Sequence, residues 1–253
     1  MTSLNKVFGQ NTYKEEAPEV DFGEFEKVVT SRRSVRRFLS TPIPDDIVRK
    51  CLSLALLAPN SSNLQPWEFH WVKSDNTKKE LDTAFLSQPA VTTAPTLIVA
   101  VARTATWKPH AKEMSELIRK EDPRHSALSY YEKIVPFVYS VGFLRSIGLI
   151  KKMFLTCMGF FKPVPREPTS NSELKTWAVK TTALACENLM LSLRAAGYDS
   201  CPMEGFDGVR VKRILQLPTD AVIVMGISAG KRADNGVYGP QLRFDEDRFI
   251  HEV

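Results

Sequence analysis

The chain has 253 residues, of which 43% are hydrophobic and 25% are charged, a balance typical of a globular protein with a sizeable core. The net charge of +5 favours anionic ligands or surfaces without choosing among them. The four cysteines and four histidines lie far apart in sequence and have no spacing typical of zinc ligands. We therefore expect no metal site, and free thiols in a reducing cytoplasm.

Residues 1–20 are polar and have no apolar period, so they predict a flexible N-terminal arm. This stretch also has no apolar run of the kind found in signal peptides, which agrees with a cytoplasmic protein. Residues 21–253 are expected to form a single domain.

Hydrophobic periodicity predicts two helices, two strands, a long helix, a short helix and a final strand. In chain order these elements cover residues 21–34, 41–59, 67–73, 95–103, 172–200, 209–218 and 221–228. Gly197 stands where the long helix needs a C-cap. The order lacks the regular alternation of a doubly wound sheet, and no Gly-x-Gly-x-x-Gly follows a strand, so the predicted class is α+β.

Residues 134–161 form a strongly apolar stretch that is interrupted by Arg145, Lys151 and Lys152. Its uncharged runs are shorter than the roughly 20 residues of a membrane-spanning helix. Two interpretations remain open. The favoured one is a set of helices that covers a ligand pocket, and the other is a basic amphipathic segment that makes weak contact with a membrane surface.

Two polar stretches carry the functional signal. "RRSVRR" at residues 32–37 places four arginines around a serine, and guanidinium and hydroxyl groups are good donors to phosphate oxygens. Taken alone, this cluster fits a solvated turn, a phosphate clamp or a nucleic-acid contact. "APNSSNLQPW" at residues 58–67 is a loop rich in hydrogen-bonding groups directly before a strand.

Together with "GYDSCPMEGFD" at residues 197–207, these stretches resemble the FMN-dependent nitroreductase family. The family has the same order of an Arg-x-Ser-x-Arg/Lys-x-Phe turn, an Ala-Pro-Ser-x-x-Asn-x-Gln-Pro-Trp loop and a Pro-x-Glu-Gly-Phe turn. The resemblance covers about residues 22–103 and 173–253 and is weak across the variable segment 104–172. It implies a nitroreductase-like fold, with a mostly antiparallel central sheet surrounded by helices, in an intertwined homodimer with FMN at the interface.

The resemblance also implies which residues bind FMN. Arg32 and Ser34, with Arg33 between them, match the grip on the flavin phosphate and ribityl chain, and Arg36 matches the cation at the N1 and O2 edge of the ring. Arg243 matches a basic residue at the phosphate. Pro59, Asn60, Ser61 and Asn63 match a loop that reaches the flavin from the partner subunit. Pro202, Met203, Glu204 and Gly205 match the turn over the ring.

The sequence departs from the family pattern at two of these places. Gln241 stands where the family often has a lysine near the phosphate, which weakens the grip unless Lys231 or Arg232 compensates. Asn60 replaces a commoner serine and keeps the capacity for hydrogen bonding.

The implied activity is hydride transfer from NAD(P)H through flavin N5 to nitroaromatic, quinone or similar electron-poor acceptors, in two half-reactions. No catalytic side chain is needed, because the cofactor supplies the chemistry. The variable segment is expected to form an apolar entrance, with candidate lining residues Phe137, Tyr139, Phe143, Phe154, Phe160 and Phe161.

Alternatives from other classes remain at this point. One is a specialised or non-turnover flavin-binding member, for example one that fragments flavin or removes halogens reductively. A nucleic-acid-binding module is much less favoured, as is a hydrolase based on "GISAG" at residues 226–230, because a segment full of helix breakers follows that motif. The physiological acceptor, the choice between NADH and NADPH, and one- or two-electron reduction do not follow from the sequence.

Overall fold

The computed structural model describes residues 15–141 and 146–253. Its N-terminal half contains α2 (Phe22–Ser31), α3 (Asp45–Ala55), η1 (Ser61–Asn63), β1 (Trp67–Val72), α4 (Asp75–Ala84), α5 (Pro89–Thr93), β2 (Thr96–Arg103) and α6 (Trp107–Glu121). The C-terminal half contains α7 (Ala127–Ser129), η2 (Tyr130–Ile134), α8 (Val135–Tyr139), α9 (Ser146–Gly159), α10 (Asn171–Ala195), β3 (Asp199–Met203), α11 (Gly208–Ile214), β4 (Ala221–Gly230) and η4 (Glu246–Arg248).

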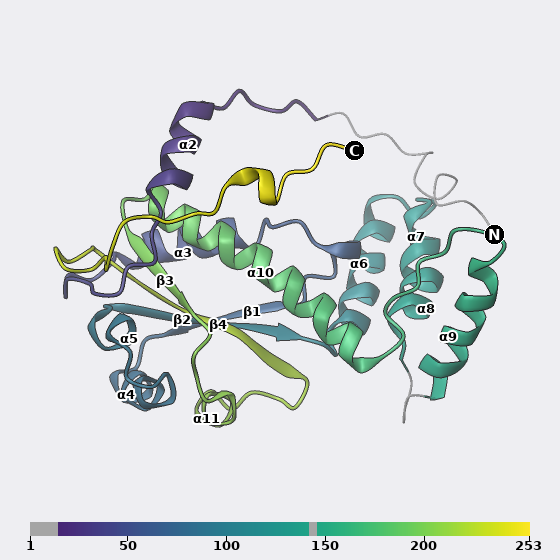
Figure 1. Ribbon diagram of the computed structural model, residues 1–253. Helices are drawn as coiled ribbons and strands as arrows, with labels where there is room; N and C mark the ends of the chain where they lie inside the picture. The colour runs from purple at the N-terminus through teal and green to yellow at the C-terminus, as the bar shows by residue number, and fades with distance from the viewer. Residues whose placement is uncertain (1–14, 142–145) are drawn as a thin grey trace.

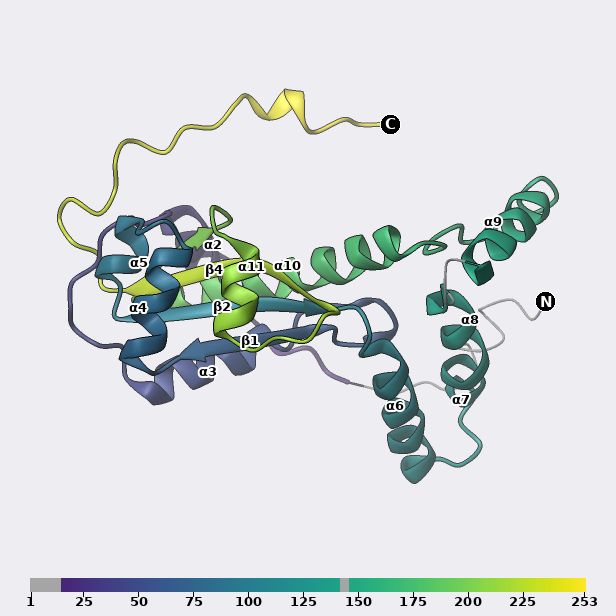
Figure 2. The same ribbon diagram turned by 90° about the horizontal axis from the view of Figure 1, so that it is seen from below.

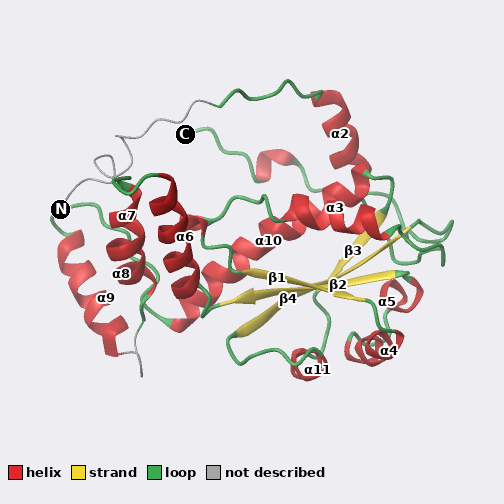
Figure 3. Ribbon diagram, turned by 180° about the vertical axis from the view of Figure 1, so that it is seen from behind, coloured by secondary structure: helices red, strands yellow, loops and turns green. Residues whose placement is uncertain are grey.

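The four strands form one fully antiparallel sheet in the order β1-β2-β4-β3. Helices α3 and α10 cover one face, and α4, α5 and α11 lie on the other (Figures 1 and 3). Side chains of β2 alternate between two cores, as the period of two in a strand requires. Ile98 and Ala100 pack on the α10 side, whereas Leu97 and Val99 pack on the α4 side. The α+β prediction is confirmed.

Local sequence explains where the helices begin and end. The carboxylate of Asp21 accepts the N–H of Glu24 at the start of α2, and the hydroxyl of Ser170 accepts the N–H of Glu173 at the start of α10. Gly197 follows α10 with φ of +79°, the left-handed conformation that ends a helix most easily with glycine.

The predicted strands over 67–73, 95–103 and 221–228 are confirmed, and so are the helices at α2, α3, α10 and α11. The long helix is shorter than predicted, because it ends at Ala195 and the chain then forms β3. Helices α4 to α6 and strand β3 were not predicted. The apolar face of α2 is not covered by the other residues that the structure describes, since Phe22, Phe25 and Val29 are all exposed. The predicted arm over residues 1–20 falls mainly outside the described residues, and residues 15–20 are exposed coil.

The segment over 104–172 is anchored in the body rather than added to its surface. Val135 and Tyr139 of this segment belong to the same buried core as α10 and β2. Tyr139 is only 3% exposed and stacks edge-on against Trp177 of α10, so the expectation that it lines an entrance is wrong. Phe143 lies outside the described residues, whereas Phe137, Phe154, Phe160 and Phe161 are exposed. No helix in the described parts of the chain is long and apolar enough to cross a membrane.

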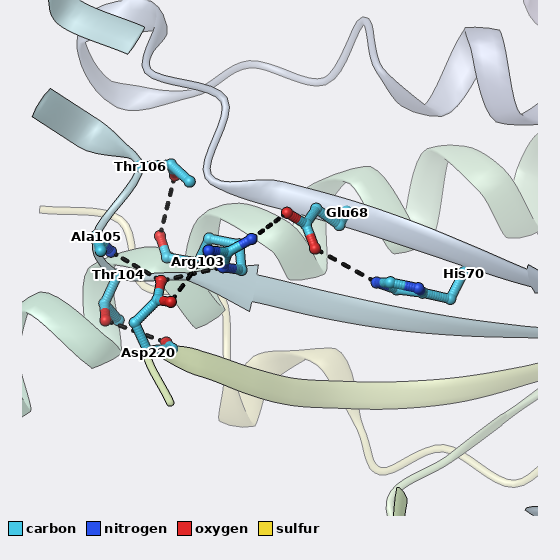
Figure 4. A network of polar contacts seen from close by, with 7 residues as sticks. All are labelled: Glu68, His70, Arg103, Thr104, Ala105, Thr106 and Asp220. Carbon is cyan, nitrogen blue, oxygen red and sulfur yellow. Dashed lines mark hydrogen bonds and ion pairs between the residues drawn. The ribbon is translucent and has the colours of Figure 1, made fainter. Parts of the chain in front are cut away.

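A polar network fixes the origin of this segment at the end of β2 (Figure 4). The guanidinium of Arg103 donates two hydrogen bonds of 3.0 Å to Asp220, just before β4, and a further one to Glu68 on β1. Asp220 also accepts the N–H of Ala105 at 3.1 Å. Burial alone would raise the pKa of Asp220, but the bonds from Arg103 and Ala105 and the charge of Arg103 outweigh it and lower that pKa. Three strands are therefore tied together where the chain leaves the sheet.

We expect Asp220→Asn to lower the free energy of unfolding by about 1–3 kcal/mol at neutral pH, because Arg103 loses its charged acceptor in a largely buried position. The folded-state pKa of Asp220 lies below the ordinary 3.8, so its stabilisation is present above about pH 4 and is lost as the pH falls through the folded-state value. Urea titrations at several pH values measure both effects.

The matched control is Glu116→Gln, which removes an exposed ion pair with Lys112 and should change the free energy of unfolding by less than about 0.5 kcal/mol. Equal losses for the two variants would contradict the assignment of Asp220 as an anchor.

Candidate cofactor site

The arginine turn, residues 32–37, lies between β3 and the C-terminal chain that returns past it at residues 236–243. The N–H of Val35 donates to the carbonyl of Ser200 at 3.0 Å, and the N–H of Arg36 donates to the carbonyl of Gly236 at 2.7 Å. Gly236 is needed at this crossing, because a Cβ there would lie 2.6 Å from the carbonyl oxygen of Arg37. Residues 165 and 200 positions apart in sequence are thereby held side by side.

A cavity of about 300 Å³ opens between these two segments. It is lined by Arg32, Arg33, Ser34 and Arg36 from the turn and by residues 237–243, which include Gln241 and Arg243, from the tail. Among the described residues, the lining contains four guanidinium groups and the hydroxyls of Ser34 and Tyr238, but no carboxylate. This set of donors suits a phosphate group, because guanidinium groups donate to two phosphate oxygens at once.

The arginines differ in what holds them. Arg33 donates to the carbonyl of Gly239 at 2.6 Å, which joins the turn to the tail across the cavity. Arg32 lies 3.6 Å from the carboxylate of Glu187 on α10. The side chain of Arg36 has no hydrogen bond or ion pair within the described residues, and its charge acts on Cys201 of β3. Burial raises the pKa of the Cys201 thiol, and the charge of Arg36 opposes this shift.

A buried carboxylate under the turn organises these elements, and the sequence analysis missed it. Asp199 is 5% exposed and binds two arginines. Arg194 of α10 donates to it at 3.2 Å, and Arg232 after β4 donates at 3.1 and 2.6 Å. Arg194 also donates to the hydroxyl of Ser31 at the end of α2. No local pattern could have revealed this cluster, since its members come from three separate parts of the chain, at residues 31, 194–199 and 232.

The cluster also shows whether Lys231 or Arg232 replaces the lysine that the family often has where this chain has Gln241. Arg232 is occupied by Asp199, and Lys231 donates to the carbonyl of Gly197 and lies over the ring of Tyr198. Neither residue lines the cavity, so neither replaces the missing lysine. Arg33 and Arg243 are the additional cations that the cavity does contain.

The predicted turn over the ring lies at the other end of β3. Met203 is buried in the sheet, whereas Glu204 and Gly205 are exposed. The side-chain amide of Gln88 donates to the carbonyl of Gly205 at 2.8 Å and fixes the turn. The separation from Ser200 to Glu204 is about 13 Å along an extended strand. The arginine turn and the 202–205 turn are therefore joined by one strand but do not share the cavity.

The predicted loop at Pro59, Asn60, Ser61 and Asn63 does not line the cavity of its own chain. Pro59, Ser61 and Asn63 are exposed. The loop is held by tyrosines of the variable segment: Tyr130 bonds the hydroxyl of Ser62 at 2.6 Å, and Tyr139 donates to the hydroxyl of Ser61 at 3.1 Å. The hydroxyl of Tyr131 donates to the carbonyl of Ser62.

These bonds hold a strained backbone, because Ser62, Asn63 and Gln65 have φ values of 58°, 47° and 45°. Burial raises the pKa of Tyr139, although its bonds to Ser61 and Ser62 oppose the shift, so the hydroxyl stays protonated at neutral pH. The variable segment thus sets the shape of the loop.

The match of one family model decides the classification. The model described as the nitroreductase family matches residues 29–231 of the chain. The chain belongs to the nitroreductase family.

Sequence relatives agree with this membership, and solved structures share the fold. An NADH dehydrogenase of Thermus thermophilus is 31% identical over 87% of this nitroreductase-family chain and 91% of its own length. A 4-nitrobenzoate reductase of Pseudomonas putida is 28% identical over 84% and 87%. A solved protein of Exiguobacterium sibiricum, assigned as a nitroreductase and in complex with FMN, has a TM-score of 0.66 at 24% identity and covers 94% of this chain and 99% of its own. A Streptococcus mutans nitroreductase-like structure has a TM-score of 0.70 at 22% identity, with coverages of 92% and 100%.

We expect Tyr139→Phe to lower the free energy of unfolding by about 1–2 kcal/mol. The reason is that the buried hydroxyl loses its bonds to Ser61 and Ser62 of the loop at residues 59–65, here called the serine loop. Amide hydrogen exchange at residues 60–65 should become faster, since the strained loop loses an anchor. The control is Tyr198→Phe, whose hydroxyl has no hydrogen bond within the described residues. Equal exchange rates at residues 60–65 in the two variants would contradict this role for Tyr139.

Proposed function

We propose that the chain is an FMN-dependent oxidoreductase that passes hydride from NAD(P)H to nitroaromatic, quinone or similar electron-poor acceptors. The observation that carries the proposal is the arginine cavity, where four cations and two hydroxyls line a volume of about 300 Å³ and no described carboxylate does. A cation cluster that converges on a small cavity fits one phosphate group better than an extended nucleic-acid backbone. The cavity therefore favours a small phosphate ligand over nucleic acid.

The residues fit FMN in two parts. Arg32, Arg33, Ser34 and Arg243 would hold the phosphate and the ribityl chain in the cavity. Arg36 would stabilise negative charge at the N1 and O2 edge of the ring, because its guanidinium is not tied to another described residue and acts toward β3. The separation of about 13 Å along β3 is comparable with the length of an extended flavin mononucleotide, so the 202–205 turn is suitably distant for the ring.

When bound, FMN supplies the hydride transfer between the nicotinamide donor and the acceptor, and the protein binds, orients and tunes it. The names of the relatives support this chemistry, since they include an NADH dehydrogenase and a 4-nitrobenzoate reductase. We propose the same two classes of substrate for this chain.

We further propose an intertwined homodimer, in which the loop at residues 59–63 completes the partner's site. The exposed apolar side chains of α2 support this arrangement, because they need a cover. The C-terminal tail supports it as well: it leaves the body as an extended arm (Figure 2) and exposes Leu242, Phe244, Phe249 and Ile250. A cytoplasmic location remains a prediction from the cysteine pattern. A single domain over residues 21–253 also remains a prediction.

The phosphate assignment predicts a difference between FMN and riboflavin. Arg32→Gln should weaken FMN binding about 10- to 100-fold, the value of a charge-assisted hydrogen bond, and should leave riboflavin binding unchanged. Fluorescence titration of the protein with each flavin measures the two affinities. Arg37→Gln is the matched control, because Arg37 is exposed and does not line the cavity. An equal loss for both flavins would contradict a phosphate contact at Arg32.

The activity predicts that purified protein loaded with FMN is yellow and loses its visible absorption when NADH or NADPH is added under nitrogen. Addition of 4-nitrobenzoate or a benzoquinone should restore the absorption, because the acceptor removes the electrons. Stopped-flow absorption gives both rates and the preferred donor. A flavin that is not reduced by either donor would favour the specialised or non-turnover alternative.

A further inference from the structure

Helix α9 carries an apolar surface that the other described residues do not cover. It lies beyond α8 at the end of the molecule farthest from α5 (Figure 2). The exposed apolar residues, here called the α9 surface, are Leu149, Ile150, Met153, Phe154, Phe160 and Phe161. Phe160 and Phe161 are 82% and 89% exposed, so these two rings are almost wholly in solvent.

Most apolar side chains of α9 face solvent and one of its lysines faces the protein, which is the reverse of a helix that packs on a core. Lys151 and Leu155 face the protein and are buried. The ammonium of Lys151 donates to the carbonyls of Val138 and Ser140 at the end of α8. At about 100° per residue, positions 149, 150, 153 and 154 span a continuous arc of about 140° on the opposite side. The apolar arc therefore points away from the body.

The charge around the α9 surface is predominantly positive, although Glu173 of α10 interacts with Lys152 and Glu167 follows Arg166. Residues 146–166 contain Lys151, Lys152, Lys162 and Arg166 and no aspartate or glutamate. Lys152, Lys162 and Arg166 are exposed beside the apolar residues, whereas Lys151 is used internally. An apolar arc edged by cations is typical of helices that lie in the headgroup region of anionic membranes.

We propose that the α9 surface docks on an anionic lipid bilayer, with α9 in the plane of the membrane. At 14 residues the helix is about 21 Å long, which is too short to span the hydrocarbon core but suits an in-plane position. The apolar side chains enter the acyl boundary, and Lys152, Lys162 and Arg166 contact the headgroup phosphates and carboxylates. This inference does not depend on the proposed flavin chemistry.

A second copy of the chain fits the α9 surface less well. A two-fold contact centred on the α9 surface would bring Lys152, Lys162 and Arg166 of the two copies close together. Repulsion between like charges opposes that pairing, whereas it favours an anionic bilayer.

Vesicle sedimentation of the FMN-loaded full chain tests the proposal. The protein should bind vesicles of phosphatidylcholine mixed with phosphatidylserine, and should bind pure phosphatidylcholine at least about 10-fold more weakly, because the three exposed cations lose their partners. High salt should reduce binding to the mixed vesicles. Equal binding to both lipids, or no binding to either, would overturn the proposal.

Two pairs of variants separate apolar from charged contributions. Phe160→Ser with Phe161→Ser should abolish binding, whereas Leu86→Ser with Val209→Ser, at exposed apolar positions elsewhere, should not. Lys152→Gln with Lys162→Gln should weaken binding about 5-fold for each charge, and Lys50→Gln with Lys79→Gln, with the same net charge, should have little effect.

Flavin content and sedimentation mass are measured for each variant. Unchanged flavin content with lost vesicle binding supports the docking surface and separates it from any failure of the flavin proposal. If the phenylalanine variant instead changes the mass of the oligomer, a second copy covers the α9 surface and the membrane proposal is wrong.

Discussion

The backbone pairing of the arginine turn is the contact on which the rest of the site depends. Residues 34–36 lie between Ser200 on β3 and Gly236 on the returning chain, and two hydrogen bonds of 3.0 and 2.7 Å hold them there. Without this crossing Arg243 would lie on a separate segment from Arg32, Arg33 and Arg36, and like charges would keep the two segments apart. With it, the guanidinium of Arg33 also bonds the tail, and the cations form one concave surface.

The surrounding fold makes that crossing rigid. Asp199 binds Arg194 and Arg232, which ties α10, β3 and the end of β4 together directly beneath the turn. At the opposite end of the sheet, Arg103 bonds Glu68 and Asp220 and fixes the point at which the variable segment begins (Figure 4). That segment then reaches the serine loop through Tyr130 and Tyr139. At both ends of the domain, therefore, partly or fully buried ion pairs and hydroxyl hydrogen bonds join separate segments of the fold.

The sequence predicted the elements whose signal is local. The strand at 67–72 alternates aromatic and polar residues, the strands at 96–103 and 221–230 are mostly apolar, and α10 has a long periodic pattern closed by Gly197. Strand β3 was not predicted because it has only five residues, two of them polar and one a proline. Pro202 is tolerated since β3 is an edge strand, where a missing N–H breaks no ladder bond on the open side. Such a position depends on strand order, which no local pattern contains.

For the site as well, local motifs predicted some residues, whereas contacts between distant residues could not be predicted. The motifs identified Arg32, Ser34 and Arg36, and the cavity contains all three together with Arg243. The motifs could not show that Lys231 and Arg232 are used elsewhere, because their partners, Gly197 and Asp199, are more than 30 residues away. The role of the loop at residues 59–63 remains a prediction, since it concerns a second subunit.

A crystal structure of the chain with FMN tests the central claim most directly. The account predicts the flavin phosphate within hydrogen-bonding distance of Arg32 and Ser34, with the ring toward residues 202–205. A phosphate outside the cavity between residues 32–36 and 237–243, or a ring at the opposite end of the sheet near Arg103, would contradict it.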